Sequence, residues 1–116
     1  MTVRRLKTYA GSQGYVYQYY FAGKRPIASP AGNEYIFDVT SNRKLTYAVS
    51  ILFPLLVADE WAKTHGRSLS NSEQYAAVKM RLFRAFDEVE DMQAHGRLLR
   101  IDLQSLEESL ASLGVD

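Results

Sequence analysis

The side chains best suited to acid–base or metal chemistry are few, and their positions do not favour it. The chain has no cysteine and two histidines, His65 and His95, each directly before a glycine. Glycine commonly follows the last residue of a helix, and a histidine in the last turn can donate to the free carbonyls there. We interpret both histidines as helix-end residues and predict no metal site, no cofactor and no catalytic residue.

A cluster of carboxylates is the other candidate for chemistry. It consists of Asp87, Glu88, Glu90 and Asp91. Paired carboxylates can bind a hard cation or act as general acid and base. Consecutive acids on a helix do not face one another, however, and no glycine-bearing calcium loop accompanies them. The pattern favours a solvated helix face. The function of a small enzyme remains an alternative only if that face borders a pocket.

The most unusual feature is an aromatic run flanked by basic residues. Residues 15–21 contain four tyrosines and a phenylalanine, and strand alternation places every second ring on the same face. Exposed rings beside lysine and arginine can stack on bases and neutralise phosphates, as in proteins that bind single-stranded nucleic acid. Tyrosine and arginine are also enriched in protein interfaces, and tyrosine is a good strand former. The candidate binding residues are Tyr15, Tyr17, Tyr19, Lys24 and Arg25.

Alternation and turn signals predict the strands that would position these residues. We predict a β-hairpin over residues 34–53, because apolar residues alternate on both sides of a polar turn at 41–44. An irregular loop is expected at 22–33, where glycine and proline are frequent. A short strand at 3–9 would pair with the tyrosine strand.

Helices are predicted in the second half of the chain. One follows Pro54 and has Trp61 as its main buried residue. A second begins at a capping box of Ser70 and Glu73 and runs to about residue 94. Residues 97–101 form either an edge strand or an extended connection. A final helix carries a leucine strip suited to docking on the domain or on another subunit, at positions 103, 106, 110 and 113.

Size and composition limit the number of domains and the compartment. The 116 residues, 47% of them hydrophobic, suffice for one core. No apolar run approaches the ~20 residues that span a bilayer, and the start of the chain lacks the apolar stretch of a signal peptide. The absence of cysteine fits a reducing compartment. We therefore expect a single α+β domain of residues 1–116 in the cytoplasm, with no membrane association.

Charge is distributed unevenly along the chain. Residues 1–44 hold seven basic and two acidic residues, a net +5, whereas residues 45–116 hold seven and eleven, a net −4. Such asymmetry indicates a basic binding face, or two faces that attract each other or a partner subunit.

These patterns lead to one prediction of fold and two of function. The fold is an N-terminal antiparallel sheet of three to four strands packed against two or three C-terminal helices. The preferred function is a small non-catalytic binding or regulatory module that acts through a protein–protein interface, with a protein partner or as a homodimer. The alternative is a single-stranded RNA- or DNA-binding protein that uses the tyrosine-rich basic strand.

Overall fold

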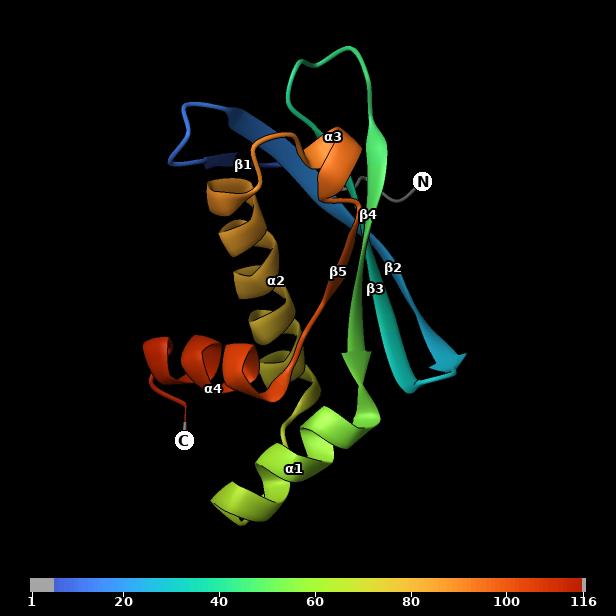
Figure 1. Ribbon diagram of the computed structural model, residues 1–116, viewed down its shortest axis with the longest axis vertical. Helices are drawn as coiled ribbons and strands as arrows, with labels where there is room; N and C mark the ends of the chain where they lie inside the picture. Colours follow the sequence, from blue (N-terminus) through green and yellow to red (C-terminus); the bar gives the residue numbers. More distant parts are fainter. Residues whose placement is uncertain (1–5, 116) are drawn as a thin grey trace.

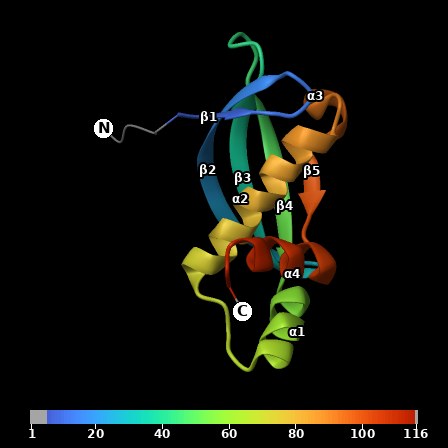
Figure 2. The same ribbon diagram turned by 90° about the vertical axis from the view of Figure 1, so that its left-hand side faces the viewer.

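The computed structural model describes residues 6–115, and within this range a five-stranded sheet packs against helices on one of its faces (Figure 1; Figure 2). Four strands form an antiparallel meander, and the fifth joins β4 in parallel. The strands are β1 (Lys7–Ala10), β2 (Val16–Ala28), β3 (Ala31–Thr40), β4 (Tyr47–Pro54) and β5 (Leu98–Arg100).

Four helices lie within the described range, all of them after β4 in the chain. They are α1 (Leu55–His65), α2 (Asn71–Glu88), α3 (Met92–His95) and α4 (Leu103–Ser112). The predicted α+β class, with an N-terminal sheet and C-terminal helices, is confirmed. The sheet has one strand more than predicted, because the segment at 97–101 contains a short parallel edge strand.

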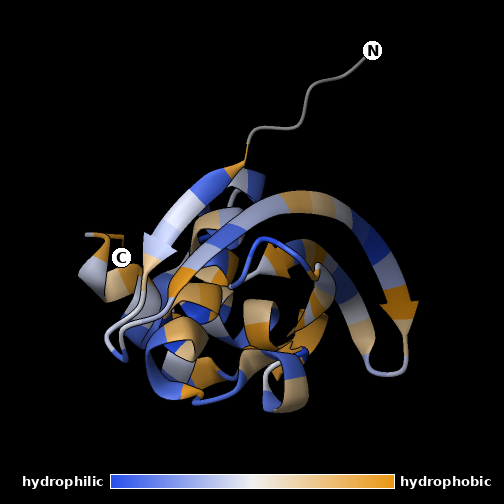
Figure 3. Ribbon diagram, turned by 90° about the horizontal axis from the view of Figure 1, so that it is seen from above, coloured by the Kyte–Doolittle hydropathy of each residue, from blue (hydrophilic) through white to orange (hydrophobic). Residues whose placement is uncertain are grey.

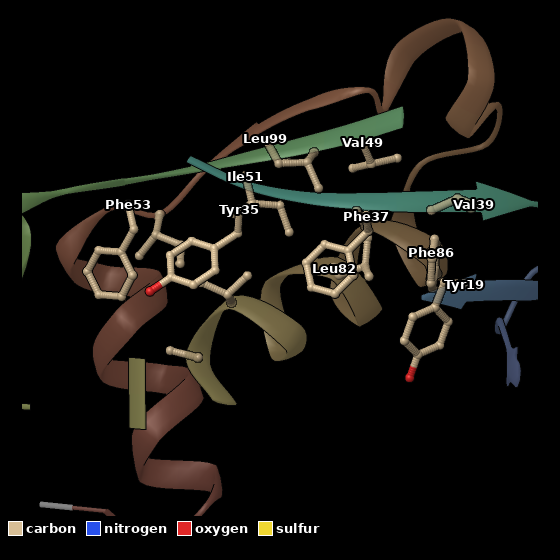
Figure 4. Close-up of a cluster of buried hydrophobic side chains, with 14 of the residues drawn as sticks. Tyr19, Tyr35, Phe37, Val39, Val49, Ile51, Phe53, Leu82, Phe86 and Leu99 are labelled. Carbon is tan, nitrogen blue, oxygen red and sulfur yellow. The ribbon is translucent and has the colours of Figure 1, made fainter. Parts of the chain in front are cut away.

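The core lies between the inner face of the sheet and α2. Apolar residues at every second position of β3 and β4 face the helices, as the alternation predicted (Figure 4). Leu82 and Phe86 of α2 are fully buried against them. The sheet curves around the helices when it is viewed along its length (Figure 3).

The local signals for the helix starts are confirmed. Ser70 and Glu73 form the predicted capping box, and Asp102 caps α4 in the same way. Trp61 is fully buried and is the buried anchor of α1. In the described part of the chain, no helix combines the length and the apolar character needed to cross a bilayer.

The predicted loop at residues 22–33 is wrong. Strands β2 and β3 continue through it, with Lys24 opposite Tyr35 and Arg25 opposite Glu34. Only Ser29 and Pro30 connect them. The strands persist because the irregularity that glycine and proline introduce is confined to one register shift, between residues 21 and 23.

One prediction about the helices is also corrected, and one pair of alternatives is decided. Helix α2 ends at Glu88 rather than near residue 94, and α3 follows as a separate turn. Of the two alternatives for the leucine strip of α4, docking on the domain is the one observed, since Leu106 and Leu110 are fully buried. These two leucines are therefore not available to another subunit. The predicted strand at 3–9 is present as β1, although residues 3–5 lie outside the described range.

Candidate functional site

The five candidate residues predicted from the sequence do not form one site. The Tyr15 side chain is 49% exposed, whereas Tyr17 and Tyr19 are 2% and 4% exposed. Tyr17 stacks on Phe86 with ring centroids 4.2 Å apart, and Tyr19 belongs to the same aromatic cluster (Figure 4). Tyr17 and Tyr19 therefore offer no free ring face for stacking on a base.

The two basic candidates lie at the other end of β2. Lys24 is nine positions from Tyr15, which corresponds to roughly 30 Å of extended strand. Its ammonium lies 5.6 Å from the centre of the Tyr35 ring, and Arg25 forms an ion pair with Glu34. Both side chains thus make cross-strand pairs within the β2–β3 hairpin.

Tyr15 belongs to a tight turn between β1 and β2. The amide of Gly11 donates to the carbonyl of Tyr15 at 2.8 Å, and the amide of Gly14 donates to the carbonyl of Gly11 at 3.2 Å. Gly14 has φ 93°, a left-handed conformation that glycine adopts without the strain of a side chain. These bonds fix the backbone of the turn at Tyr15.

Asp87 attaches this turn to the end of α2. Its carboxylate accepts from the Tyr9 hydroxyl at 2.7 Å and from the Ser12 amide at 2.9 Å. The hydroxyl of Ser12 and the side-chain amide of Gln13 donate to the last carbonyls of α2, those of Asp87 and Glu88. Asp87 is therefore a structural link rather than part of a solvated face, and the turn caps the helix. The hydrogen bond to Asp87, with burial and the nearby negative charge, raises the pKa of Tyr9 to about 12.

The link brings the acidic segment after α2 next to Tyr15. Asp91 caps α3, because its Oδ1 accepts from the Ala94 amide at 3.2 Å. Glu90 and Asp91 are both exposed. His95 is the last residue of α3, directly before Gly96, which agrees with its interpretation as a helix-end residue. His65 ends α1, stacks on Trp61 and contacts Glu107 at 3.0 Å.

The loop between β3 and β4 forms the remaining wall. The side-chain carbonyl of Asn42 accepts from the amides of Lys44 and Leu45, both at 2.9 Å. The hydroxyl of Thr40 accepts from the amide of Arg43 at 3.1 Å. This loop, the β1–β2 turn and the α2–α3 connection lie together at the upper end of the molecule (Figure 1). We call this region, residues 11–16, 40–46 and 89–92, the Tyr15 end.

Two hollows lie on either side of Tyr15. The first, which we call the acidic hollow, measures about 380 Å³ and is lined by Tyr15, Tyr17, Ser41, Glu90, Asp91 and Met92. The second measures about 300 Å³ and is lined by residues 14–16, 18 and 40–43. Tyr15 and Ser41 line both hollows and form the ridge between them.

The hydroxyl of Tyr47 is buried close to the acidic hollow. Tyr47 is 6% exposed, and its hydroxyl has no hydrogen-bond partner among the described residues. Burial, followed by the charges of Tyr17 and Asp91, raises its pKa to about 12. Arg97 and Ser41 act in the opposite direction, but no hydrogen bond of ordinary geometry joins Ser41 to Tyr47. Tyr17, Asp91 and Ser41 line the acidic hollow, whereas Tyr47 is not among its lining residues.

A further hollow of about 230 Å³ lies between α2 and the start of α4 and contains three arginines. Arg84 forms ion pairs with Glu88 and Glu108. The Nε of Arg81 donates to the carbonyl of Arg100 at 3.1 Å. Of the three arginines that line this hollow, Arg84 alone forms ion pairs among the described residues.

The functional side chains of the Tyr15 end are tyrosines and carboxylates. Within residues 6–115, no group of three or more His, Asp or Glu side chains is close enough to hold a metal ion. Tyrosine rings and carboxylates meet in the acidic hollow, and sequence reasoning missed this combination. It assigned Glu90 and Asp91 to a solvated helix face and did not single out Ser41 or Met92. One signal was present: the twelve residues from 85 to 96 contain four acids and no lysine or arginine.

Comparison of the chain with protein-family models, with curated proteins and with solved structures gave no significant match. Functional conclusions therefore depend on the residues of the site.

Proposed function

We propose that the protein is a small non-catalytic binding module that holds a protein partner at the Tyr15 end. The observation that carries this proposal is a half-exposed tyrosine on a ridge between two hollows. Tyrosine is among the residues that most often dominate the binding energy of interfaces. A partner side chain inserted on either side of the ridge would contact the Tyr15 ring.

Two further features support a protein partner. Val16 and Leu45, which belong to the Tyr15 end, are 51% and 54% exposed, so apolar surface accompanies the aromatic ring. The turn and the loop are held by the internal hydrogen bonds of Asp87 and Asn42. A preformed surface loses less conformational entropy on binding than a mobile one.

The nucleic-acid alternative has less support. Stacking needs exposed rings, and of the three candidate tyrosines Tyr15 alone is exposed. Glu90 and Asp91 lie beside it and would repel phosphates, while Lys24 and Arg25 are at the opposite end of β2.

The proposal is tested by affinity capture from native cells with three immobilised proteins: the wild-type chain, Tyr15→Ala and Leu98→Ala. Leu98 is 67% exposed on β5 and serves as an apolar control away from the Tyr15 end. A stoichiometric protein companion should bind the wild type and Leu98→Ala and be lost with Tyr15→Ala. With the purified companion, loss of the ring should weaken binding by about 2 kcal/mol, roughly thirtyfold.

Two results would overturn the proposal. One is a companion that binds Tyr15→Ala as tightly as the wild type. The other is co-purification of nucleic acid with an affinity that falls steeply as salt rises, which would favour the alternative. If the partner is a second copy of the chain, sedimentation of the purified protein should show a dimer for the wild type and a monomer for Tyr15→Ala.

A further inference from the structure

We infer that the hollow between α2 and the start of α4 binds a phosphomonoester group, carried by a phosphorylated side chain of a partner protein or present as free phosphate. We call it the arginine hollow, because three arginines line it together with two carboxylates: Arg81, Arg84, Arg100, Glu88 and Asp102. It shares no residue with the Tyr15 end, so this second site goes beyond the proposed function.

Two elements bring the arginines together. Arg81 and Arg84 are three positions apart on α2, so they project from the same side of the helix. Arg100 is the last residue of β5, which lies beside α2 and leads into α4 (Figure 1). The Nε of Arg81 donates to the carbonyl of Arg100 at 3.1 Å. This bond joins α2 to β5 and leaves the two terminal nitrogens of Arg81 without a partner among the described residues.

The charge of the arginines is only partly neutralised within the protein. Arg84 pairs with Glu88 and Glu108. Neither Arg81 nor Arg100 forms an ion pair within residues 6–115. Burial, followed by the charge of Arg84, lowers the pKa of Arg81, while two nearby carboxylates act in the opposite direction. A partly buried guanidinium without a carboxylate partner indicates an anionic ligand, because an anion in the hollow would stabilise its charged form.

The two carboxylates leave the hollow open to an anion. Asp102 caps α4, because its Oδ1 accepts from the Ser105 amide at 2.7 Å. Glu88 accepts from the Nε of Arg84 at 3.1 Å, but the two side chains are 62% and 49% exposed. Ion pairs at such exposure contribute little to stability, so a more highly charged anion can replace Glu88 on Arg84. The start of α4 adds the positive end of a helix dipole.

The size of the hollow and the donors around it favour a phosphomonoester over other anions. Its volume is about 230 Å³, below the roughly 300–1,000 Å³ of pockets that enclose whole small molecules, so it suits a single ionic group. A phosphomonoester carries a charge of about −1.5 to −2 at pH 7 and three acceptor oxygens. Guanidinium groups donate to phosphate oxygens in pairs. A carboxylate or a phosphodiester carries a single negative charge and would neutralise the arginines less well.

The test titrates the isotope-labelled protein with four probes at constant ionic strength and follows backbone amide signals by NMR. The probes are inorganic phosphate, capped phosphoserine, capped glutamate and dimethyl phosphate, which is a phosphodiester. Phosphate and capped phosphoserine should shift the signals of residues 81, 84, 100 and 102–105. Capped glutamate and dimethyl phosphate should leave them unchanged at the same concentration. Tighter binding of capped phosphoserine than of phosphate identifies a phosphorylated side chain as the source, and the reverse identifies free phosphate.

Four variants tie the binding to the proposed groups. Arg100→Gln removes a positive charge from an exposed side chain and should weaken phosphate binding about tenfold without lowering the unfolding temperature. Arg81→Lys keeps the charge but loses the planar guanidinium, and should also bind more weakly. Glu88→Gln removes the competing carboxylate and should bind more tightly. Lys63→Gln removes a positive charge from an exposed position in α1, away from the hollow, and should leave binding unchanged.

Three results would contradict the phosphate site. They are binding of capped glutamate or dimethyl phosphate as tight as that of phosphate, unchanged binding in Arg100→Gln, and the absence of any shift with both phosphate probes. Such a failure is distinguishable from failure of the proposed function. If Tyr15→Ala loses a protein companion but neither phosphate probe binds, the binding module stands and the phosphate site is wrong. If the probes bind but no companion depends on Tyr15, the phosphate site stands and the proposed binding surface is wrong.

Discussion

At the scale of single residues, the tyrosines show what a sequence pattern can decide and what it cannot. Alternation places Tyr15, Tyr17 and Tyr19 on one face, and Tyr17 and Tyr19 do lie on the inner side of β2. Their exposure differs because α2 covers Tyr17 and Tyr19, whereas Tyr15 lies before the first residue of β2. Residues 15–21 carry aromatic rings on both faces, so the sequence alone could not identify the covered one.

The interaction of Tyr9 with Asp87 leads to a prediction at alkaline pH. The pKa of Tyr9 is raised from 10.0 to about 12, so folding favours the neutral phenol. Its contribution to stability is complete below pH 10 and is lost as the pH rises toward 12. Asp87→Asn should bring the pKa of Tyr9 back toward its ordinary value. The measurement is the ultraviolet absorbance of phenolate as a function of pH.

Comparison with Tyr9→Phe identifies the contribution of Tyr9 to that titration curve. Tyr15→Phe, which removes the hydroxyl of a half-exposed tyrosine, is the matched control. If subtracting the Tyr9→Phe curve from that of the wild type reveals an ordinary tyrosine titration, Asp87 does not hold the Tyr9 hydroxyl.

At the scale of elements, features that depend on neighbouring residues could be predicted from the sequence, whereas features that depend on residues far apart in the chain could not. The capping box of α2 and the anchor Trp61 could be predicted because their signals lie within a few residues. The end of α2 could not be predicted from its own residues, because Ser12 and Gln13, which are 75 positions away in the sequence, bind its last carbonyls. The acidic hollow was hidden for the same reason, since its residues come from three separate segments.

The junction between the β2–β3 hairpin and α1 gives a second prediction. A side chain at Gly32 would collide with the backbone of residues 53–55, which lies against it. Gly32→Ala should therefore destabilise the protein by about 1–3 kcal/mol, as overpacking generally does. Gly23→Ala is the matched control, because a methyl group there meets no atom within 4 Å. Urea unfolding of both variants checks this, and equal midpoints would contradict the close approach.

At the scale of the whole molecule, the leucines of α4 belong to the core. Leu106→Ala should cost about 2–5 kcal/mol of folding stability, because it leaves a cavity in a fully buried position. Leu113, which is 45% exposed near the end of α4, is the control, and Leu113→Ala should change stability little. Thermal unfolding measures both. A loss of oligomer mass in Leu106→Ala without a loss of stability would instead restore the leucine strip as a subunit interface.

The long hairpin of β2 and β3 has a consequence for how the chain behaves at high concentration. Strand β1 pairs with β2 only as far as Tyr19. Beyond Tyr19, β2 is an edge strand with no partner on its outer side among the described residues. Open borders recruit strands from neighbouring molecules and seed fibres. Here the register shift after Phe21 bends this edge of β2, Lys24 places a charge on it and Pro26 removes a backbone N–H donor. We therefore expect the residues that resembled a loop in the sequence to protect the hairpin against aggregation.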